Sequence, residues 1–335
     1  MTPSPSSITS PFRNDSLNRL FRVVIVVGTL ALIAVSVPDW LPFRYPAKLR
    51  KQTALLEQVR ALEKDLDAFP GGEEKLPEKE DLVRRLLAAE TQLLRLRKRL
   101  EPSDRTEVYR EPLGAEVHQV VSELGKRDFI VPESFVASVR DEIAAFVEPD
   151  NRGTLERCFA RKPRFEKLIH QELDRMKLPP DFLYIAMQES LLDSGAQSGN
   201  DARGLWQMVP ETARNVGLRV PEDWKTAPPE QDERTRPKPA TRAAAKYLRA
   251  LYSDFGDAAL CLTAYNAGEG KLRKTLRRIE DQDSHRDYWY IYRMGMMSPE
   301  TREYVPKIIA MILIDRNRPR YGFTPDKAAP GQALR

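Results

Sequence analysis

The chain of 335 residues contains few of the side chains that usually bind metals. It has three histidines and two cysteines, Cys158 and Cys261, and none of them stands at a spacing typical of metal ligands. We therefore expect no protein-built metal site and no cofactor, and the chemistry should depend on carboxylates, hydroxyls and amides. Because Cys261 lies in the apolar run ALCL, we expect both cysteines to be free thiols, although an oxidising compartment could join them.

Glycine is also scarce, with 16 residues, whereas charged residues make up 31% of the chain. This composition favours helices over a glycine-rich β-sandwich, and no segment reads as a series of alternating strands. We expect a mostly α fold, with one of its helices from about Thr241 to Phe255. The net charge of +5 is mild for this length, and no basic stripe is interleaved with aromatic residues. These features argue against a nucleic-acid partner but remain compatible with an acidic polymer or a membrane surface.

One long apolar run stands near the N-terminus, at residues 23–38, with arginines before it and Trp40 after it. Its length lies between that of a cleaved signal peptide and that of a membrane span. Cleavage near Ala34 and Ser36 would give a soluble periplasmic protein. The aromatic residues that follow favour a retained anchor, with residues 1–22 in the cytoplasm and the rest of the chain in the bacterial periplasm. We expect attachment to the inner membrane.

A helical spacer is predicted over residues 48–105. Its apolar residues follow heptad spacing in two groups: Leu55, Val59, Leu62, Leu66 and Phe69, then Leu82, Leu86, Ala89, Leu93, Leu96 and Leu100. The link PGGEEKLP, residues 70–77, contains helix breakers, so the two helices either fold back as a hairpin or form part of an oligomeric coiled coil. The segment is either a simple spacer or a site for self-association or for an envelope partner.

A helical region over residues 115–178 precedes a short apolar helix that contains Glu189. This residue shares a helical face with Phe182 and Ile185, and the helix is expected to end at Ser194–Gly195. Burial and the helix dipole should both raise the pKa of Glu189, which would let the group donate a proton near neutral pH. A structural carboxylate held by a basic side chain or a tyrosine hydroxyl is the alternative interpretation.

Four motifs follow in order: Glu189–Ser190, GLWQ at 204–207, AYNAG at 264–268, and Tyr304. With these motifs, residues 130–320 resemble the lytic murein transglycosylases that have a soluble-lytic-transglycosylase type of catalytic domain. The resemblance implies a mostly helical, goose-type lysozyme-like fold, with the catalytic domain at 179–320 and a tail at 321–335. It also implies cleavage of the β-1,4 bond between N-acetylmuramic acid and N-acetylglucosamine in peptidoglycan, with a 1,6-anhydro product.

The resemblance assigns the acid/base role to Glu189 and implies that Tyr304 hydrogen-bonds its carboxylate. Ser190 either contacts substrate or makes a helix-end hydrogen bond, and Tyr265 either lines the cleft or packs in the core. We expect Trp206 to lie in the core. The substrate-binding residues implied by the resemblance are Ser190, Gln207, Tyr265, Asn266 and Tyr304.

Most glycosidases use two carboxylates, whereas the transglycosylase reaction needs one, which acts first as acid and then as base. Asp193 and Glu269 are the two further carboxylates near the motifs, and we interpret both as structural. Two other functions remain open from the sequence. One is a muramidase that admits water, and the other is a non-catalytic scaffold that binds glycan.

Overall fold

Helices account for all the regular secondary structure in residues 45–70, 76–105, 107–126, 128–280 and 286–324, which the computed structural model describes. No strand occurs in these ranges, and the mostly helical fold class is confirmed. The α-helices are α2 (Tyr45–Asp67), α3 (Leu76–Lys98), α4 (Pro112–Glu123), α5 (Glu133–Val147), α6 (Pro149–Arg175), α7 (Leu183–Ser190), α8 (Pro210–Asn215), α9 (Pro237–Phe255), α10 (Ala258–Ala267), α11 (Glu269–Leu276), α13 (Tyr288–Met294) and α14 (Pro299–Arg316). Short 3-10 turns lie at Pro102–Asp104, Pro180–Phe182, Pro229–Gln231, Glu233–Thr235 and Arg318–Tyr321.

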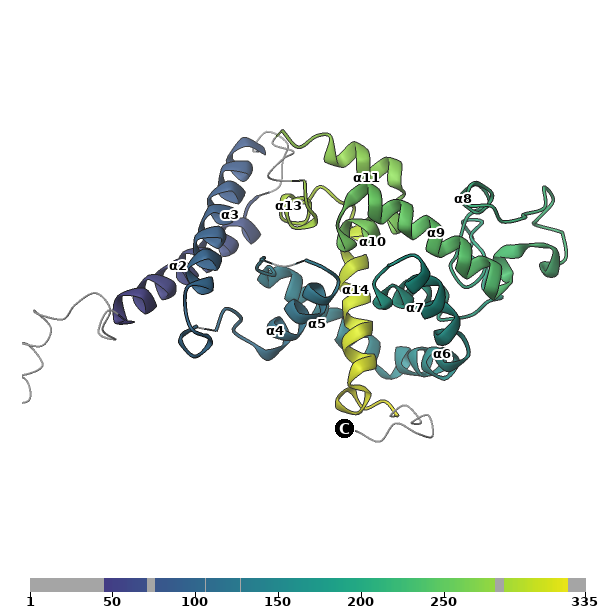
Figure 1. The fold of residues 1–335 in the computed structure, drawn as a ribbon, viewed down its shortest axis with the longest axis horizontal. Helices are drawn as coiled ribbons and strands as arrows, with labels where there is room; N and C mark the ends of the chain where they lie inside the picture. Colours follow the sequence, from purple (N-terminus) through teal and green to yellow (C-terminus); the bar gives the residue numbers. More distant parts are fainter. Residues whose placement is uncertain (1–44, 71–75, 106, 127, 281–285, 325–335) are drawn as a thin grey trace, which may run out of the picture.

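Helices α2 and α3 pack against each other along their heptad-spaced residues (Figure 1). The apolar centre of this seam is formed by Val59, Leu62 and Leu86, each less than 5% exposed. Of the two arrangements that the sequence allowed, the folded-back hairpin is the one observed. The hairpin does not stand apart from the rest of the chain, because α3 also packs against α13.

The apolar run predicted to anchor the chain, residues 23–38, lies outside the described residues. Among the helices that are described, none is both long enough and apolar enough to cross a membrane.

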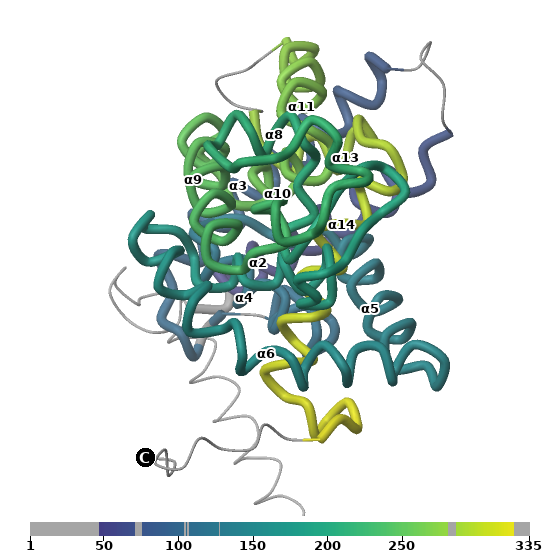
Figure 2. The backbone as a smooth tube through the Cα atoms, turned by 90° about the vertical axis from the view of Figure 1, so that its right-hand side faces the viewer, coloured from purple at the N-terminus to yellow at the C-terminus, as the bar shows by residue number. Residues whose placement is uncertain are grey.

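The core of the remaining body forms around α10 and α14. Asp257 caps α10 by accepting a hydrogen bond from the amide of Leu260 at 2.9 Å, and the helix is buried from Ala258 to Ala264. Helix α14 runs through the body, with α4 and α5 packed against it as well as α7 and α10 (Figure 1). The side view shows α6 crossing near the lower part of α14, while α9, α10 and α11 lie around its upper part (Figure 2).

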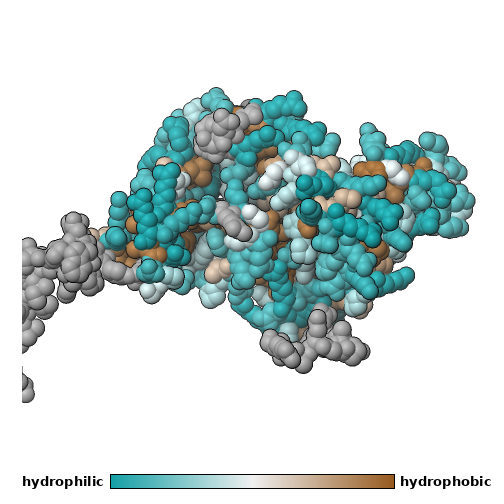
Figure 3. All heavy atoms as spheres, viewed as in Figure 1, coloured by the Kyte–Doolittle hydropathy of each residue, from teal (hydrophilic) through white to brown (hydrophobic). Residues whose placement is uncertain are grey.

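Polar side chains dominate the surface seen in Figure 3, and hydrophobic ones show mainly between helices. Large exposed hydrophobic residues in the described ranges are limited to Leu49, Leu76 and Val209. Cys158 and Cys261 are buried free thiols, as the apolar surroundings of Cys261 predicted.

Two helix boundaries differ from those predicted. The helix with Glu189 ends at Ser190 instead of Ser194–Gly195, because Leu191 and Leu192 adopt left-handed conformations with φ of 52° and 57°. Burial of the Leu192 side chain stabilises this early end, which local sequence signals did not reveal. Helix α9 begins at Pro237, four residues before the predicted start, because proline is tolerated in a first helical turn.

Candidate active site

Glu189 lies at the C-terminal end of α7 and faces a cavity of about 470 Å³. The cavity is formed by the end of α7, the segment from Ser198 to Val209, and parts of α8, α9, α10 and α14. Three of the four sequence motifs therefore meet at one place. The lining residues are Glu189, Ser198, Asn200, Ala202, Gln207, Met208, Val209, Thr212, Tyr247, Tyr265, Asn266, Ala267, Gly268 and Glu300.

Among the residues that the structure describes, one side chain bonds directly to the carboxylate of Glu189: the hydroxyl of Tyr304 donates to Oε1 at 2.6 Å. Burial is the largest influence on Glu189 and raises its pKa to about 7. The hydrogen bond from Tyr304 lowers that pKa, and the negative charge of Glu300 raises it. Burial, one of the two causes that the sequence predicted, is thus the main cause, and Glu189 can hold a proton near neutral pH.

Tyr304 is itself buried and does not line the cavity. Its hydroxyl reaches Glu189 from the protein interior. The contact therefore fixes one oxygen of the carboxylate and leaves the side that faces the cavity accessible. We therefore interpret Tyr304 as a positioning residue instead of a direct substrate contact.

The GLWQ segment forms a tight turn on one wall of the cavity. Gly204 has φ of +78°, and a Cβ at this position would collide with the carbonyl oxygen of Arg234, so glycine is required for two reasons. Trp206 lies in the core, as predicted, and its indole N–H donates to Thr241 Oγ1 at 3.1 Å. The buried Trp206 side chain thus anchors the turn to the core, both by packing and by this hydrogen bond.

Gln207 points its amide group along the cavity wall. Its Nε2 donates to the carbonyl oxygens of Ala196 at 3.1 Å and Gly204 at 2.8 Å. Because these bonds use both amide hydrogens, the amide oxygen is the atom left to accept a hydrogen bond from a ligand.

Arg234 holds the segment that carries Gln207, although no sequence motif pointed to it. Its guanidinium is fully buried, pairs with Asp232 at 2.7 Å, and donates to the carbonyl oxygens of Asp201 at 2.8 Å and Met208 at 3.0 Å. The same group lies 4.7 Å from the centre of the Trp224 ring. A buried arginine in a proline-rich connection has no periodic signal, so its role could not be predicted from the sequence.

The AYNAG segment, at the end of α10, supplies another part of the cavity wall. The hydroxyl of Tyr265 donates to the carbonyl oxygen of Trp206 at 2.6 Å, and its half-buried ring lies 5.8 Å from the ring of Tyr247. Tyr265 therefore lines the cavity and also joins two motifs. Asn266 lines the cavity beside it, and Gly268 ends the helix with φ of 89°.

Ser190, one of the predicted binding residues, does not line the cavity. The side chain is buried and donates to the carbonyl oxygens of Ala186 at 3.1 Å and Leu205 at 2.8 Å. The geometry therefore corresponds to the helix-end hydrogen bond, one of the two interpretations that the sequence left open. Ser190 connects the Glu189 helix to the GLWQ turn.

The further carboxylates near the motifs have different surroundings. Asp193 pairs with Arg161 at 3.2 Å and Glu269 with Arg273 at 3.5 Å, and neither lines the cavity, which agrees with a structural role. Glu300, at the start of α14, does line it. Glu300 was not predicted as a site residue because only the fold brings the start of α14 to the cavity.

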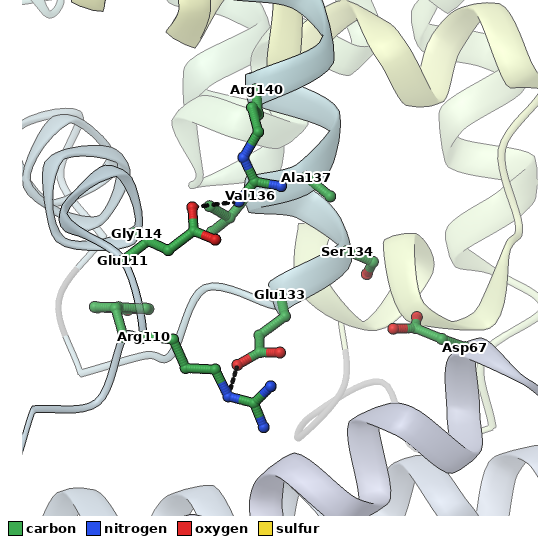
Figure 4. A pocket seen from close by; sticks show the side chains of 10 residues that line it. Asp67, Arg110, Glu111, Gly114, Glu133, Ser134, Val136, Ala137 and Arg140 are labelled. Carbon is green, nitrogen blue, oxygen red and sulfur yellow. Dashed lines mark hydrogen bonds and ion pairs between the residues drawn. The ribbon is translucent and has the colours of Figure 1, made fainter.

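A separate cavity of about 330 Å³ lies between the hairpin and α5 (Figure 4). Its charged groups are largely paired with each other, Arg110 with Glu133 at 3.4 Å and Arg140 with Glu111 at 2.7 Å. Asp67, at the end of α2, faces this space from the hairpin side. It contains none of the four motifs, so we do not regard it as the candidate active site.

Backbone strain is concentrated around the candidate active site. Six non-glycine residues in the described ranges have positive φ, and four of them are Leu191, Leu192, Asp201 and Gln207. Each such conformation costs of the order of 1 kcal/mol. Two of these residues directly follow the Glu189 helix, and two belong to the segment that forms the cavity wall.

Residues 167–287 match the family model of the transglycosylase SLT domain. The resemblance seen in the sequence is confirmed over this range. The matched segment contains Glu189, the GLWQ turn and the AYNAG segment, whereas Glu300 and Tyr304 lie beyond its end.

Several known proteins are similar to parts of this chain. Membrane-bound lytic murein transglycosylase D of Escherichia coli K12 is 30% identical over 173 residues, which cover 51% of this chain and 36% of that protein. Peptidoglycan transglycosylase gp16 of Escherichia phage T7 is 39% identical over 110 residues, which cover 32% of this chain and 8% of that protein. The chain thus spans only a minor part of the length of these relatives.

A solved structure, the 70 kDa soluble lytic transglycosylase of Escherichia coli, aligns with a TM-score of 0.40 and 19% sequence identity. The alignment covers 83% of this chain and 52% of that chain.

Proposed function

We propose that this chain is a peptidoglycan lytic transglycosylase with a goose-type lysozyme-like catalytic domain at residues 179–320. It would cleave the β-1,4 bond between N-acetylmuramic acid and N-acetylglucosamine and leave a 1,6-anhydro ring on the muramic acid. The observation that carries the proposal is Glu189 in an open cavity, with a pKa of about 7 and one oxygen fixed by Tyr304. The SLT family match over the same segment supports it.

In the proposed reaction, Glu189 gives its proton to the glycosidic oxygen as the bond from that oxygen to C1 of the muramic acid breaks. The positive charge that develops at the sugar is stabilised by the substrate's acetamido group and by dipoles of the cleft. The carboxylate of Glu189 then accepts the proton of the C6 hydroxyl as that oxygen bonds to C1. Asn266, Tyr265 and the amide oxygen of Gln207 would orient the sugar.

A hydrolytic muramidase is the second candidate function, and one observation favours it. Glu300 lines the same cavity as Glu189, so a second carboxylate is present that could activate water. The two functions give different products, because hydrolysis leaves a reducing muramic acid that is one water heavier than the anhydro form.

Purified peptidoglycan sacculi, incubated with the full-length chain, would test these functions by mass analysis of the released fragments. We expect 1,6-anhydromuropeptides from the wild type and none from Glu189→Gln. Reducing ends would favour the muramidase. Binding to sacculi with no release of fragments would instead indicate a non-catalytic, glycan-binding scaffold.

We propose the bacterial inner membrane as the location, with residues 23–38 as the anchor and the catalytic domain in the periplasm. The hairpin, within the spacer at 48–105, would connect the two and offer a surface for self-association or an envelope partner. Fractionation of cells that express the full chain tests this arrangement. Recovery of a soluble periplasmic form that starts near Val37 would contradict the anchor.

A further inference from the structure

A buried ionic contact joins the hairpin to helix α13. The guanidinium of Arg293 lies 2.6 Å from a carboxylate oxygen of Glu90 on α3 and 3.8 Å from one of Glu63 on α2. All three side chains are buried. A second contact is made by Lys79 of α3, whose ammonium donates to the carbonyl oxygen of Met294 at 2.9 Å. The hairpin therefore holds α13 at two points, the side chain of Arg293 and the carbonyl group of Met294 at the C-terminal end of the helix.

Helix α13 in turn contacts the beginning of α14. The guanidinium of Arg302 donates to the carbonyl oxygen of Tyr292 at 3.0 Å and lies 4.0 Å from the centre of the Tyr292 ring. Arg302 stands between Glu300, which lines the candidate active site, and Tyr304, which binds Glu189. An unbroken series of contacts thus runs from the hairpin to the catalytic carboxylate.

The beginning of α14 depends on such contacts because the helix contains Pro306. Proline has no N–H to donate to the carbonyl oxygen of Arg302, and its ring crowds that carbonyl group. Beyond the proline, α14 is firmly buried from Ile308 to Ile314. Residues 299–305 are less strongly held by their own helix, so their position responds to the neighbouring α13.

Elsewhere the hairpin meets the body away from α13, where Arg60 of α2 donates to the carbonyl oxygen of Val108 at 3.0 Å and lies 4.0 Å from Glu133. At the end of α2, Asp67 lines the cavity of about 330 Å³ together with Glu133 and Ser134 of α5 (Figure 4). On its other side, α13 is held by α5, where Ser138 Oγ and Tyr292 Oη lie 3.2 Å apart. Helix α13 therefore lies between α5 and the hairpin and contacts both. Loss of the contacts on either side would allow it to shift.

We propose that the α2/α3 hairpin is a positioning element of the active site, which acts through α13 to place Tyr304 and Glu300 against Glu189. The inference rests on the proposed function and adds to it a role for a segment that would otherwise be a spacer. A partner or a membrane contact that moves the hairpin would then change the activity of the enzyme.

Two lysines of α3 offer a matched test in the full-length chain. Lys79→Met removes the contact with α13, whereas Lys98→Met removes the ion pair with Asp128, 2.6 Å long, which joins the hairpin to the body away from α13. Both changes delete one charge and keep an apolar side chain. Lys79→Arg is the conservative variant, because it keeps a donor for the α13 carbonyl group.

We expect Lys79→Met to lower kcat on sacculi by roughly three- to tenfold with little change in KM. The alkaline limb of its pH profile should move to higher pH, because the bond from Tyr304, which lowers the pKa of Glu189, outweighs the effect of Glu300. Lys98→Met should behave like the wild type, and Lys79→Arg should restore both values. Equal behaviour of the two methionine variants would overturn the proposal.

Hydrogen exchange of residues 299–305 gives a second measurement that needs no activity. We expect faster exchange in Lys79→Met than in Lys98→Met, and equal rates would again contradict a role for the hairpin. A wild-type chain that releases no fragments from sacculi would refute the proposed function, but the exchange result would still decide whether the hairpin holds the start of α14.

Discussion

Replacement of Glu189 by glutamine should remove glycan cleavage and also stabilise the fold at alkaline pH. The amide keeps the shape of the side chain but cannot deliver a proton, so the rate should fall by a factor on the order of 10² to 10⁴ or more. The effect on stability arises because the folded protein raises the pKa of Glu189 from 4.5 to about 7.

The sign of the stability effect follows from proton binding. Between pH 4.5 and about pH 7 the folded state holds a proton on Glu189 that the unfolded state has released, so wild-type stability falls as the pH rises through this range. At 1.36 kcal/mol per pH unit, the difference amounts to about 3 kcal/mol. The hydrogen bond from Tyr304 is already included in this figure, because it is one of the causes that set the pKa at about 7.

Urea denaturation at pH 4.5 and pH 8 measures the effect. We expect Glu189→Gln to match the wild type at the lower pH and to exceed it by about 3 kcal/mol at the higher pH. Asp193→Asn is the control, since this carboxylate is more exposed and pairs with Arg161; it should show no such gain and should keep its activity. A Glu189→Gln difference that does not change with pH would refute the reasoning, as would substantial residual cleavage.

Three further variants test the groups around Glu189. Tyr304→Phe should raise the pKa of Glu189, move the alkaline limb of the pH profile upward and slow cleavage by roughly tenfold, and an unchanged profile would exclude the contact. Glu300→Gln should move that limb to lower pH because it removes a like charge, so a shift in the opposite direction would count against this cause. Arg234→Met takes from the buried Asp232 its partner at 2.7 Å and leaves only the longer ion pair with Arg203 at 3.6 Å, so urea denaturation should show a loss of about 3 kcal/mol; a loss of less than about 1 kcal/mol would mean that the pair does not hold the cavity wall.

Local patterns were sufficient to predict several of the helices and the centre of the candidate site. Glu189 stood out because a carboxylate shared a face with Phe182 and Ile185, and both prove to be buried. The free thiol of Cys261 was likewise expected from the apolar run that surrounds it. Each of these predictions depends on neighbours within one or two helical turns, which is the range over which sequence periodicity carries information.

The features that the sequence did not reveal depend on contacts between distant segments. Glu300 is more than a hundred residues from Glu189 in the chain, and Arg234 acts on the carbonyl groups of Asp201 and Met208. The helix end at Ser190 was placed too late because the burial of Leu192, and no local stop signal, determines it. The packing of the hairpin against α13 likewise joins segments that are far apart in the chain.

The left-handed residues beside Glu189 have a consequence for any attempt to engineer a more robust variant. Glycine or asparagine at position 191 would relax the backbone, and such a substitution is among the first that a search for thermostability would select. The gain in stability would come from a change in the turn that follows the helix, and this turn also fixes the direction in which the Glu189 side chain points. A substitution at this position should therefore raise thermal stability and lower the catalytic rate. Selection for heat resistance alone should recover slower enzymes.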